Sequence, residues 1–498
     1  MLSLLLLIPV IGALVTAFLP KKLDSVDLRK ISLLFAAIIL LVTLGIVLLF
    51  KPQITELQFA ENVIWIEWLG LNYQLGLDGL SLPLLFLNSL LTLIAIYSTK
   101  KVLARPRLYY SLIFLLNAGV TGAFLAQDLL LFFLCYELEI VPLYFLIAIW
   151  GGKRRGYAAM KFLLYTAISG FLVLISFLGL VWFTGADSFN YQSLLGHNLP
   201  VETQILLLIP LLVGLGIKIP IFPFHTWLPD AHVEASTPVS VLLAGVLLKL
   251  GTYGLLRFGV GLFLEAWVEL APWLATIAAV SALYGASCAI AQQDMKKVVA
   301  YSSIAHMAYV LLAAAATTPL SLAAAVFQMV SHGLISALLF MIVGVVYEAT
   351  GTRDVNSLSG LLNPQRGLPI TGSLMILGVM ASAGIPGMIG FIAEFLVFRG
   401  SFPIFPIPTL LCMVGTGLTA VYFLLVVNRV FFGRLSPDLA KLPTIELGKH
   451  LPHFALMLLI FIWGIQPGWM LRWSEAQTNA LINPDTAIIG SSELGFRG

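Results

Sequence analysis

The sequence is poor in charged residues. Only 10% of its 498 residues are Asp, Glu, Lys or Arg, whereas soluble globular proteins contain about 25%. Apolar residues make up 60%, and the mean hydropathy is +1.00. A water-soluble fold cannot hide so much apolar surface, so the composition predicts a polytopic membrane protein. The net charge of +3 gives no support for nucleic-acid binding, because in a membrane protein the position of Lys and Arg matters more than their sum.

Cysteines and cofactor motifs are equally scarce. Cys135, Cys288 and Cys412 lie singly in apolar segments, which excludes a disulfide framework and a Cys-x-x-Cys metal or cluster site. The sequence has no Walker loop, no complete G-x-G-x-x-G and no haem-attachment motif, so nucleotide binding and electron transfer are not expected of this chain. We therefore expect no cofactor and no metal in the chain itself, and any redox chemistry would belong to partner proteins.

Long apolar runs dominate what remains. The first run has no basic segment before it, and Lys21 and Lys22 follow it, which is typical of a retained span rather than a cleaved signal. A bilayer core of about 30 Å needs about 20 apolar residues per helix. The predicted spans number fourteen and cover 2–19, 31–50, 80–98, 110–126, 129–150, 162–183, 205–222, 237–258, 271–290, 298–316, 322–347, 369–398, 407–431 and 452–471.

The basic residues divide unevenly between the loops of this topology. Twenty of the 27, Lys296 among them, lie on one side, which the positive-inside rule identifies as cytoplasmic. The other side holds Lys51, Arg257, Arg399, Arg472 and Arg497. Both termini are therefore expected on the non-cytoplasmic side.

Glu137, Lys218, Lys249 and Glu394 lie inside predicted spans. A charge at membrane depth is costly and marks a functional site by default. Lys249 could instead snorkel to an interface, but its distance from both ends of the span argues against that. Glu139 is a second candidate partner for Lys218. Residues two positions apart on a helix point about 200° apart, so only one of the two glutamates can face the lysine.

Two predicted spans are interrupted by Pro and Gly, the seventh (GLGIKIPIFPFHTWLP from Gly214) and the twelfth (ASAGIPGMIGFIAEF from Ala381). Each contains a charge near its break, and a separation of five spans means that they enter from opposite sides. We therefore expect two inverted five-helix repeats, spans 4–8 and 9–13, with an ion pathway at the broken helices. The expected units are 1–109, 110–258, 259–431 and 432–498. Kinked packing without a pathway is the alternative.

The histidines form two groups. His306 and His332 lie in spans 10 and 11 beside Ser and small residues, where they could relay protons or serve as hydrogen-bonded packing residues. His225, Asp230 and His232 follow the seventh span. They are possible accessory residues, or they merely cap a helix end at a loop.

Longer motifs carry a family resemblance. The stretch KIPIFPFHTWLPDAHVEASTPVSVLLAGVLLKLGTYGLLRF, from Lys218, resembles the signature of the antiporter-like subunits in the membrane arm of complex I. The resemblance covers nearly the whole chain, through YELEIVPLYFLIAIWGG, KKVVAYSSIAHMAYV, FQMVSHGLISALLF and GIPGMIGFIAEF. Glu394 in the twelfth span, where the other such subunits usually have lysine, and the lack of a long C-terminal lateral helix make it similar to the chain 4 type. The residues of the first two motifs resemble those of cyanobacterial and chloroplast members of the family.

The resemblance implies roles for the membrane charges. Glu137 would be the glutamate paired with Lys218, and Glu139 an extra acid. Lys249 would be the central lysine and Glu394 the terminal acid, and the two histidines of spans 10 and 11 would connect them. Replacing Lys218 by Met or Glu137 by Ala would then abolish pumping, and Glu139→Gln would be milder.

The resemblance also implies a proton-translocating subunit of an NAD(P)H- or ferredoxin-plastoquinone oxidoreductase in a thylakoid membrane. Its partners would be lipids and other membrane-arm subunits, including neighbouring antiporter-like ones, and the quinone and iron–sulfur clusters would lie in other subunits. The sequence leaves two alternatives open: a subunit of a multisubunit Mrp-type cation/proton antiporter, and a scaffold with vestigial charges.

Overall fold

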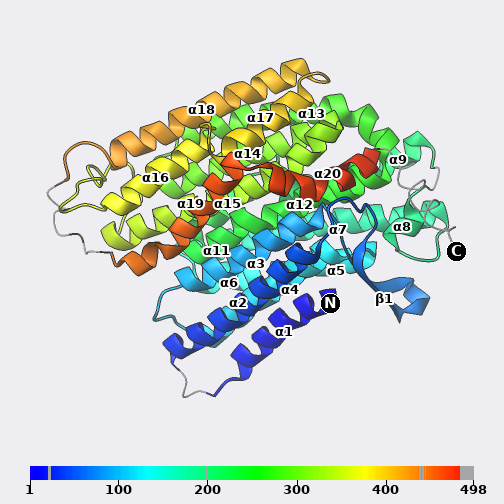
Figure 1. The fold of residues 1–498 in the computed structure, drawn as a ribbon, viewed down its shortest axis with the longest axis horizontal. Coiled ribbons are helices and arrows are strands. Elements are labelled where there is room, and N and C mark those ends of the chain that lie inside the picture. The colour runs from blue at the N-terminus through cyan, green and yellow to red at the C-terminus, as the bar shows by residue number, and fades with distance from the viewer. Residues whose placement is uncertain (21–23, 197–198, 437–438, 440–441, 443–444, 483–498) are drawn as a thin grey trace.

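The computed structural model describes residues 1–20, 24–196, 199–436, 439, 442 and 445–482. The predicted loop charges Lys21, Lys22, Lys441 and Arg497 lie outside the described residues, as does the end of the fourth expected unit. Figure 1 shows long helices lying side by side across the molecule, with α1 and α2 at one edge and α18 at the opposite edge.

The described part of the chain is mainly helical. Its helices are α1 (Leu2–Phe18), α2 (Ser25–Leu49), α3 (Ser81–Ser98), α4 (Pro106–Leu125), α5 (Leu129–Leu138), α6 (Ile140–Trp150), α7 (Arg155–Thr184), α8 (Tyr191–Leu194), α9 (Val201–Lys218), α10 (Trp227–Glu234), α11 (Thr237–Leu242), α12 (Leu248–Gly254), α13 (Leu264–Ile290), α14 (Met295–Ala316), α15 (Pro319–Thr350), α16 (Pro369–Ser382), α17 (Ile389–Ser401), α18 (Pro406–Val430), α19 (Leu451–Ile465) and α20 (Gly468–Ile482), with short 3-10 helices η1 (Glu67–Leu69) and η5 (Leu447–His450) and π-helical segments η2 (Leu243–Leu247) and η3 (Leu255–Val260).

Twelve helical stretches of the described residues are long and apolar enough to cross a membrane. The first predicted span is the shorter apolar helix α1, and the twelfth is divided between α16 and α17. The multi-pass helical fold is therefore confirmed, whereas the count of fourteen and the repeat boundaries stay predictions.

One element is not helical. The segment between the second and third predicted spans contains an antiparallel hairpin of β1 (Gln58–Ile66) and β2 (Leu71–Leu77). Gly70 joins the two strands beside η1 with a left-handed φ of 66°, a conformation that glycine adopts without strain. The expectation of helices alone missed this hairpin because its alternation is weak next to the surrounding apolar runs.

Burial separates central helices from peripheral ones. The most apolar part of the stretch Thr237–Val260 is wholly buried, and the most apolar parts of α14 and α15 are nearly so. Helices α2, α7 and α18, by contrast, expose most of the corresponding part. Exposed apolar side chains on the peripheral helices fit a lipid surround, in which apolar surface needs no burial. The central helices are the ones that carry Lys249, His306 and His332.

The two predicted helix breaks are present. Helix α9 ends at Lys218 and α10 begins at Trp227, with Pro220 and Pro223 between them. Helix α16 ends at Ser382 and α17 begins at Ile389. Proline removes a helical hydrogen bond and clashes with the preceding turn, which explains why neither stretch continues as one helix.

Further irregularities were not expected. The fifth predicted span is interrupted at Glu139, between α5 and α6. The cause is Pro142, which has no N–H to donate to the carbonyl of Leu138 four residues earlier. In the eighth span, π-helical segments η2 and η3 flank the short helix α12 that carries Lys249. Such segments often mark functional sites.

Two basic residues assigned to loops are buried instead. Arg257 is 2% exposed and forms an ion pair with Asp78, which directly follows strand β2. Lys296 is also buried, and its Nζ donates a hydrogen bond to the Ala235 carbonyl at 2.6 Å. The loop assignment was wrong for these residues because hydropathy measures span length and cannot show which charges find partners inside the bundle.

Candidate functional site

Lys218 lies at the last residue of α9, where the helix breaks. Its ammonium forms an ion pair with Glu139, and both side chains are 0% exposed. The Nζ atom also lies 4.2 Å from the centroid of the Tyr136 ring. The break therefore places a lysine between a carboxylate and an aromatic face in a water-excluded interior.

The predicted partner of Lys218 was the other glutamate, and that prediction is wrong for this structure. Glu137 is half-buried, and its carboxylate lies against Gly170 of α7. Its Oε1 atom has no hydrogen-bond partner among the described residues. The physical reason is that residues two positions apart on a helix point about 200° apart. Glu139 contacts Lys218 on the same side as Tyr136, whereas the Glu137 carboxylate lies against α7 at Gly170.

Lys249 is 1% exposed and does not snorkel. Its Nζ donates to the Ala244 carbonyl at 2.5 Å and lies 2.7 Å from His332 Nδ1. Ala244 belongs to the π-helical segment η2. The irregular backbone thus supplies a carbonyl oxygen to the lysine, and the second contact leads directly to α15.

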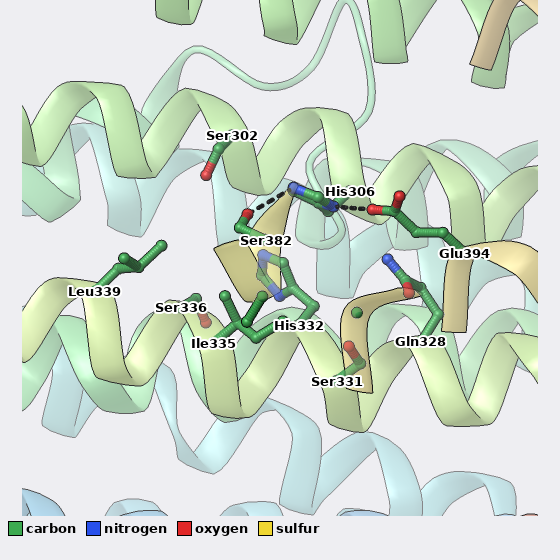
Figure 2. Close-up of a pocket in the computed structure, with 12 residues that line it drawn as sticks. Ser302, His306, Gln328, Ser331, His332, Ile335, Ser336, Leu339, Ser382 and Glu394 are labelled. Carbon is green, nitrogen blue, oxygen red and sulfur yellow. Dashed lines mark hydrogen bonds and ion pairs between the residues drawn. The ribbon is translucent and has the colours of Figure 1, made fainter. Parts of the chain in front are cut away.

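Figure 2 shows how the chain of polar groups continues from His332 to Glu394. The rings of His332 and His306 have centroids 6.0 Å apart. On the far side, His306 Nδ1 lies 3.1 Å from Glu394 Oε1, and its Nε2 lies 3.2 Å from Ser382 Oγ. Three separate helices and the end of α16 therefore meet at His306.

A small polar cavity adjoins these groups (Figure 2). Its volume is about 10 Å³, and its lining includes hydroxyl groups, the Gln328 amide and both histidines. A cavity of this size with several polar partners has room for about one water molecule. A single water would suffice to bridge groups that are too far apart for direct proton transfer.

Within the described residues, the side chains of the remaining predicted residues form no hydrogen bond or ion pair with this chain of groups. His232 is buried in α10, its ring stacked on Phe340 with centroids 4.4 Å apart. His225 packs against the Tyr284 ring at 4.8 Å, and Asp230 pairs with Lys161 at 2.8 Å. Asp230 and His232 lie in α10 and His225 lies in the turn before it, and these three side chains do not form one cluster.

The structure does not join all predicted groups directly. In the parts of the chain that it describes, no hydrogen bond or ion pair connects the Lys218–Glu139 pair to Lys249. The same parts contain no group of three or more His, Cys, Asp or Glu side chains arranged to hold a metal ion. The chemistry that the arrangement supports is proton transfer between fixed titratable groups, since His, Lys and Glu all exchange protons.

Sequence reasoning missed several residues of the site. Tyr136, Ser382 and Gln328 were not singled out, although all three contact or line the charged groups. A signal was available for Tyr136, because it precedes Glu139 by three residues and such residues share a helix face. The other two join the site only through the packing of helices distant in sequence.

Comparisons with known proteins agree on the class of protein. The profile of the family described as NADH:quinone oxidoreductase/Mrp antiporter, TM, matches residues 126–419. A protein from a Nostoc species called NAD(P)H-quinone oxidoreductase chain 4 1 is 39% identical over 490 residues, covering 96% of this chain and 90% of its own. A protein of the same name from a Synechococcus species is 45% identical over 391 residues, covering 77% and 74%.

Solved structures show the same fold. A chain of respiratory complex I from Thermus thermophilus with bound NADH superposes with a TM-score of 0.87 at 26% identity, covering 97% of this chain and 100% of the other. A chain of the Mrp complex from a Dietzia species also has a TM-score of 0.87, at 21% identity, over 98% and 99% of the two chains. At that identity, the second likeness supports the fold alone.

Proposed function

The chain belongs to the NADH:quinone oxidoreductase/Mrp antiporter family of membrane subunits, with chain 4 of NAD(P)H-quinone oxidoreductases among its relatives, and from this premise we propose that it moves protons along its buried Glu, Lys and His side chains. It is an integral, multi-pass membrane subunit of a complex I-type oxidoreductase. The driving reaction, quinone reduction, takes place elsewhere in the complex.

The observation that carries this proposal is the run of contacts from Lys249 through His332 and His306 to Glu394. Each neighbouring pair is in hydrogen-bond or ring contact, and all four side chains are buried. Four titratable groups in membrane-spanning helices would be costly to retain without a use. Imidazole can accept a proton at one nitrogen and release one from the other, so the two histidines can connect a lysine with a carboxylate.

The Lys218–Glu139 pair supplies the control step of the proposed mechanism. In a low-dielectric interior, the charge of a partner strongly affects how firmly a lysine holds its proton. Separation of Lys218 from Glu139 would change the proton affinity of Lys218, and re-formation of the ion pair would restore the original affinity. The proposed proton-carrying groups are Lys218, Lys249 and Glu394. The accessory groups, on the entry side, are His225, Asp230 and His232. Glu137 remains a proposed translocation residue, without the pairing first assigned to it.

The setting of the complex is also part of the proposal. The cyanobacterial relatives support a thylakoid membrane, plastoquinone as acceptor, and ferredoxin or NAD(P)H as donor. Other membrane-arm subunits would surround the chain, iron–sulfur clusters would lie in further partners, and both termini would lie on the non-cytoplasmic side.

Replacement of the central lysine tests the proposal. In the assembled complex reconstituted into vesicles, Lys249→Met should abolish proton uptake coupled to quinone reduction, because methionine fills the space without carrying a proton. Lys30→Met is the matched control, since Lys30 is 71% exposed at a helix start, and it should pump normally. Wild-type pumping by the Lys249 variant would contradict the proposed path.

Purification of the tagged chain decides between this proposal and the antiporter alternative. Co-purified quinone-site and iron–sulfur subunits support a redox-driven pump. Only small membrane subunits, together with cation-dependent proton exchange, would favour the Mrp-type antiporter.

A further inference from the structure

Tyr136 is a buried aromatic residue that the proposed mechanism does not yet use. Its side chain is 0% exposed, and the centroid of its ring lies 4.2 Å from Lys218 Nζ. An ammonium at this distance from an aromatic face is attracted by the negative charge density of the ring, more strongly where water is excluded. Lys218 therefore has two electrostatic partners, one carboxylate and one ring.

The hydrogen bonds available to Lys218 make the second partner important. An ammonium group has three donors, and within the described residues the side chain of Lys218 has Glu139 as its one hydrogen-bond acceptor. When this ion pair opens, a buried cation without another partner would be strongly destabilised. The ring is the favourable surface already in contact with it.

A hydrogen-bond chain fixes the position of the ring. The Ser169 hydroxyl donates to the Gly214 carbonyl at 2.6 Å and lies 2.9 Å from the Tyr136 hydroxyl. Because a serine hydroxyl has a single hydrogen, Tyr136 must be the donor to Ser169. Gly214 lies four residues before Lys218 on α9, so the network links the ring to the helical turn that ends at the lysine.

Glycine is needed for that link. A Cβ atom on Gly214 would lie 2.7 Å from the Ser169 carbonyl oxygen, so α7 and α9 approach too closely for a larger residue. This close approach brings the serine hydroxyl within reach of both partners, one on α5 and one on α9.

We propose that Tyr136 is a positioning residue for Lys218: when the Glu139 pair opens, its ring face holds the ammonium in place until the proton is transferred. This inference rests on the proposed function and extends it by one residue. The titratable groups around the ammonium are Glu139 and Tyr136, which contact it, and Glu137, which acts on it from farther away; all three come from α5 and its junction with α6.

The sharpest test changes the charge of the ring face and keeps its shape. Tyr136→Phe retains the aromatic face and loses only the hydroxyl, whereas Tyr136→pentafluoro-Phe has nearly the same shape with the sign of the face reversed. Proton pumping and quinone reduction would be measured against pH in the purified, reconstituted complex. We expect the Phe variant to pump within about twofold of wild type, because the ring supplies the interaction.

The fluorinated variant should behave differently. We expect its pumping to fall at least about tenfold at alkaline pH, with the alkaline limb of the pH profile moved to lower pH by about one unit. A packing role would predict the same profile for both variants, and that result would overturn the proposal. Equal loss in both would assign the effect to the hydroxyl and the Ser169 bond, and would also overturn it.

Two further variants separate this inference from the proposed function. Lys218→Met should abolish pumping if Lys218 carries protons, and normal pumping by this variant would refute the function itself. Loss in Lys218→Met together with an unchanged fluorinated variant would refute only the role of Tyr136. Tyr110→Leu, a change at a buried tyrosine of α4 outside the site, should leave the pH profile in place.

Discussion

Neutralising Glu139 should be far more damaging than neutralising Glu137. In Glu139→Gln, Lys218 loses its carboxylate partner while its side chain stays fully buried. Removing one member of a buried ion pair typically costs about 3–5 kcal/mol, because the remaining charge is uncompensated. Glu137→Gln removes a half-buried carboxylate that has no ion-pair partner within the described residues. It leaves no buried charge unpaired, so its effect on stability should be about 1 kcal/mol.

The two variants should also separate in function. Without Glu139, Lys218 either loses its proton permanently or moves to another partner, and in both cases it cannot alternate between two states. We expect less than about a tenth of the wild-type ratio of protons pumped to quinone reduced, whereas Glu137→Gln should keep at least about half. Vesicle acidification, normalised to quinone reduction in the same preparation, measures this ratio.

A double variant provides the internal control. Replacing both members of the pair, as in Lys218→Met with Glu139→Leu, removes both buried charges, a change that is often neutral or stabilising. On heating, the double variant should therefore stay in the assembled complex as well as the wild-type chain does, but it should not pump protons. The reasoning would be refuted if Glu137→Gln stopped pumping while Glu139→Gln did not, because Glu137 would then be the working partner.

Two other contacts lead to predictions on stability and pH. Asp78→Asn leaves Arg257 buried without its carboxylate, so we expect a loss of about 3–5 kcal/mol and poor assembly on native gels, relieved when Arg257 is also replaced by Met. Burial acts to raise the pKa of Glu61, but hydrogen bonds from the Met1 amino group and from Ser3 outweigh it and hold that pKa below its usual value. Because the pKa of Glu61 is lowered in the folded state, its bonds to Met1 and Ser3 contribute their full stabilisation of the α1 end above the unfolded-state pKa of about 4.3. This stabilisation is lost as the pH falls through the folded-state pKa. Hydrogen exchange of the first turn of α1, corrected for intrinsic rates, should therefore show protection at pH 7 that disappears under acid, and Glu61→Gln should remove it at both pH values.

Sequence alone went furthest where a single segment carries the information. Hydropathy and the rarity of charge predicted a multi-pass helical membrane protein, because a bilayer requires long apolar helices whatever they pack against. Proline and glycine predicted the breaks after Lys218 and before Glu394, since backbone geometry is local. The long motifs around Lys218 and Lys249 predicted the family to which the comparisons assign the chain.

Tertiary structure alone decided how those segments meet. The choice of Glu139 over Glu137 depends on the direction in which α5 faces α9, and the burial of Arg257 depends on an aspartate 179 residues away. The contacts of His306 with Glu394 and Ser382 likewise join helices that the sequence separates by more than 70 residues. Hydropathy and local spacing fix which residues lie at membrane depth, but the pairing of charges depends on the close packing of side chains between helices, which no single segment contains.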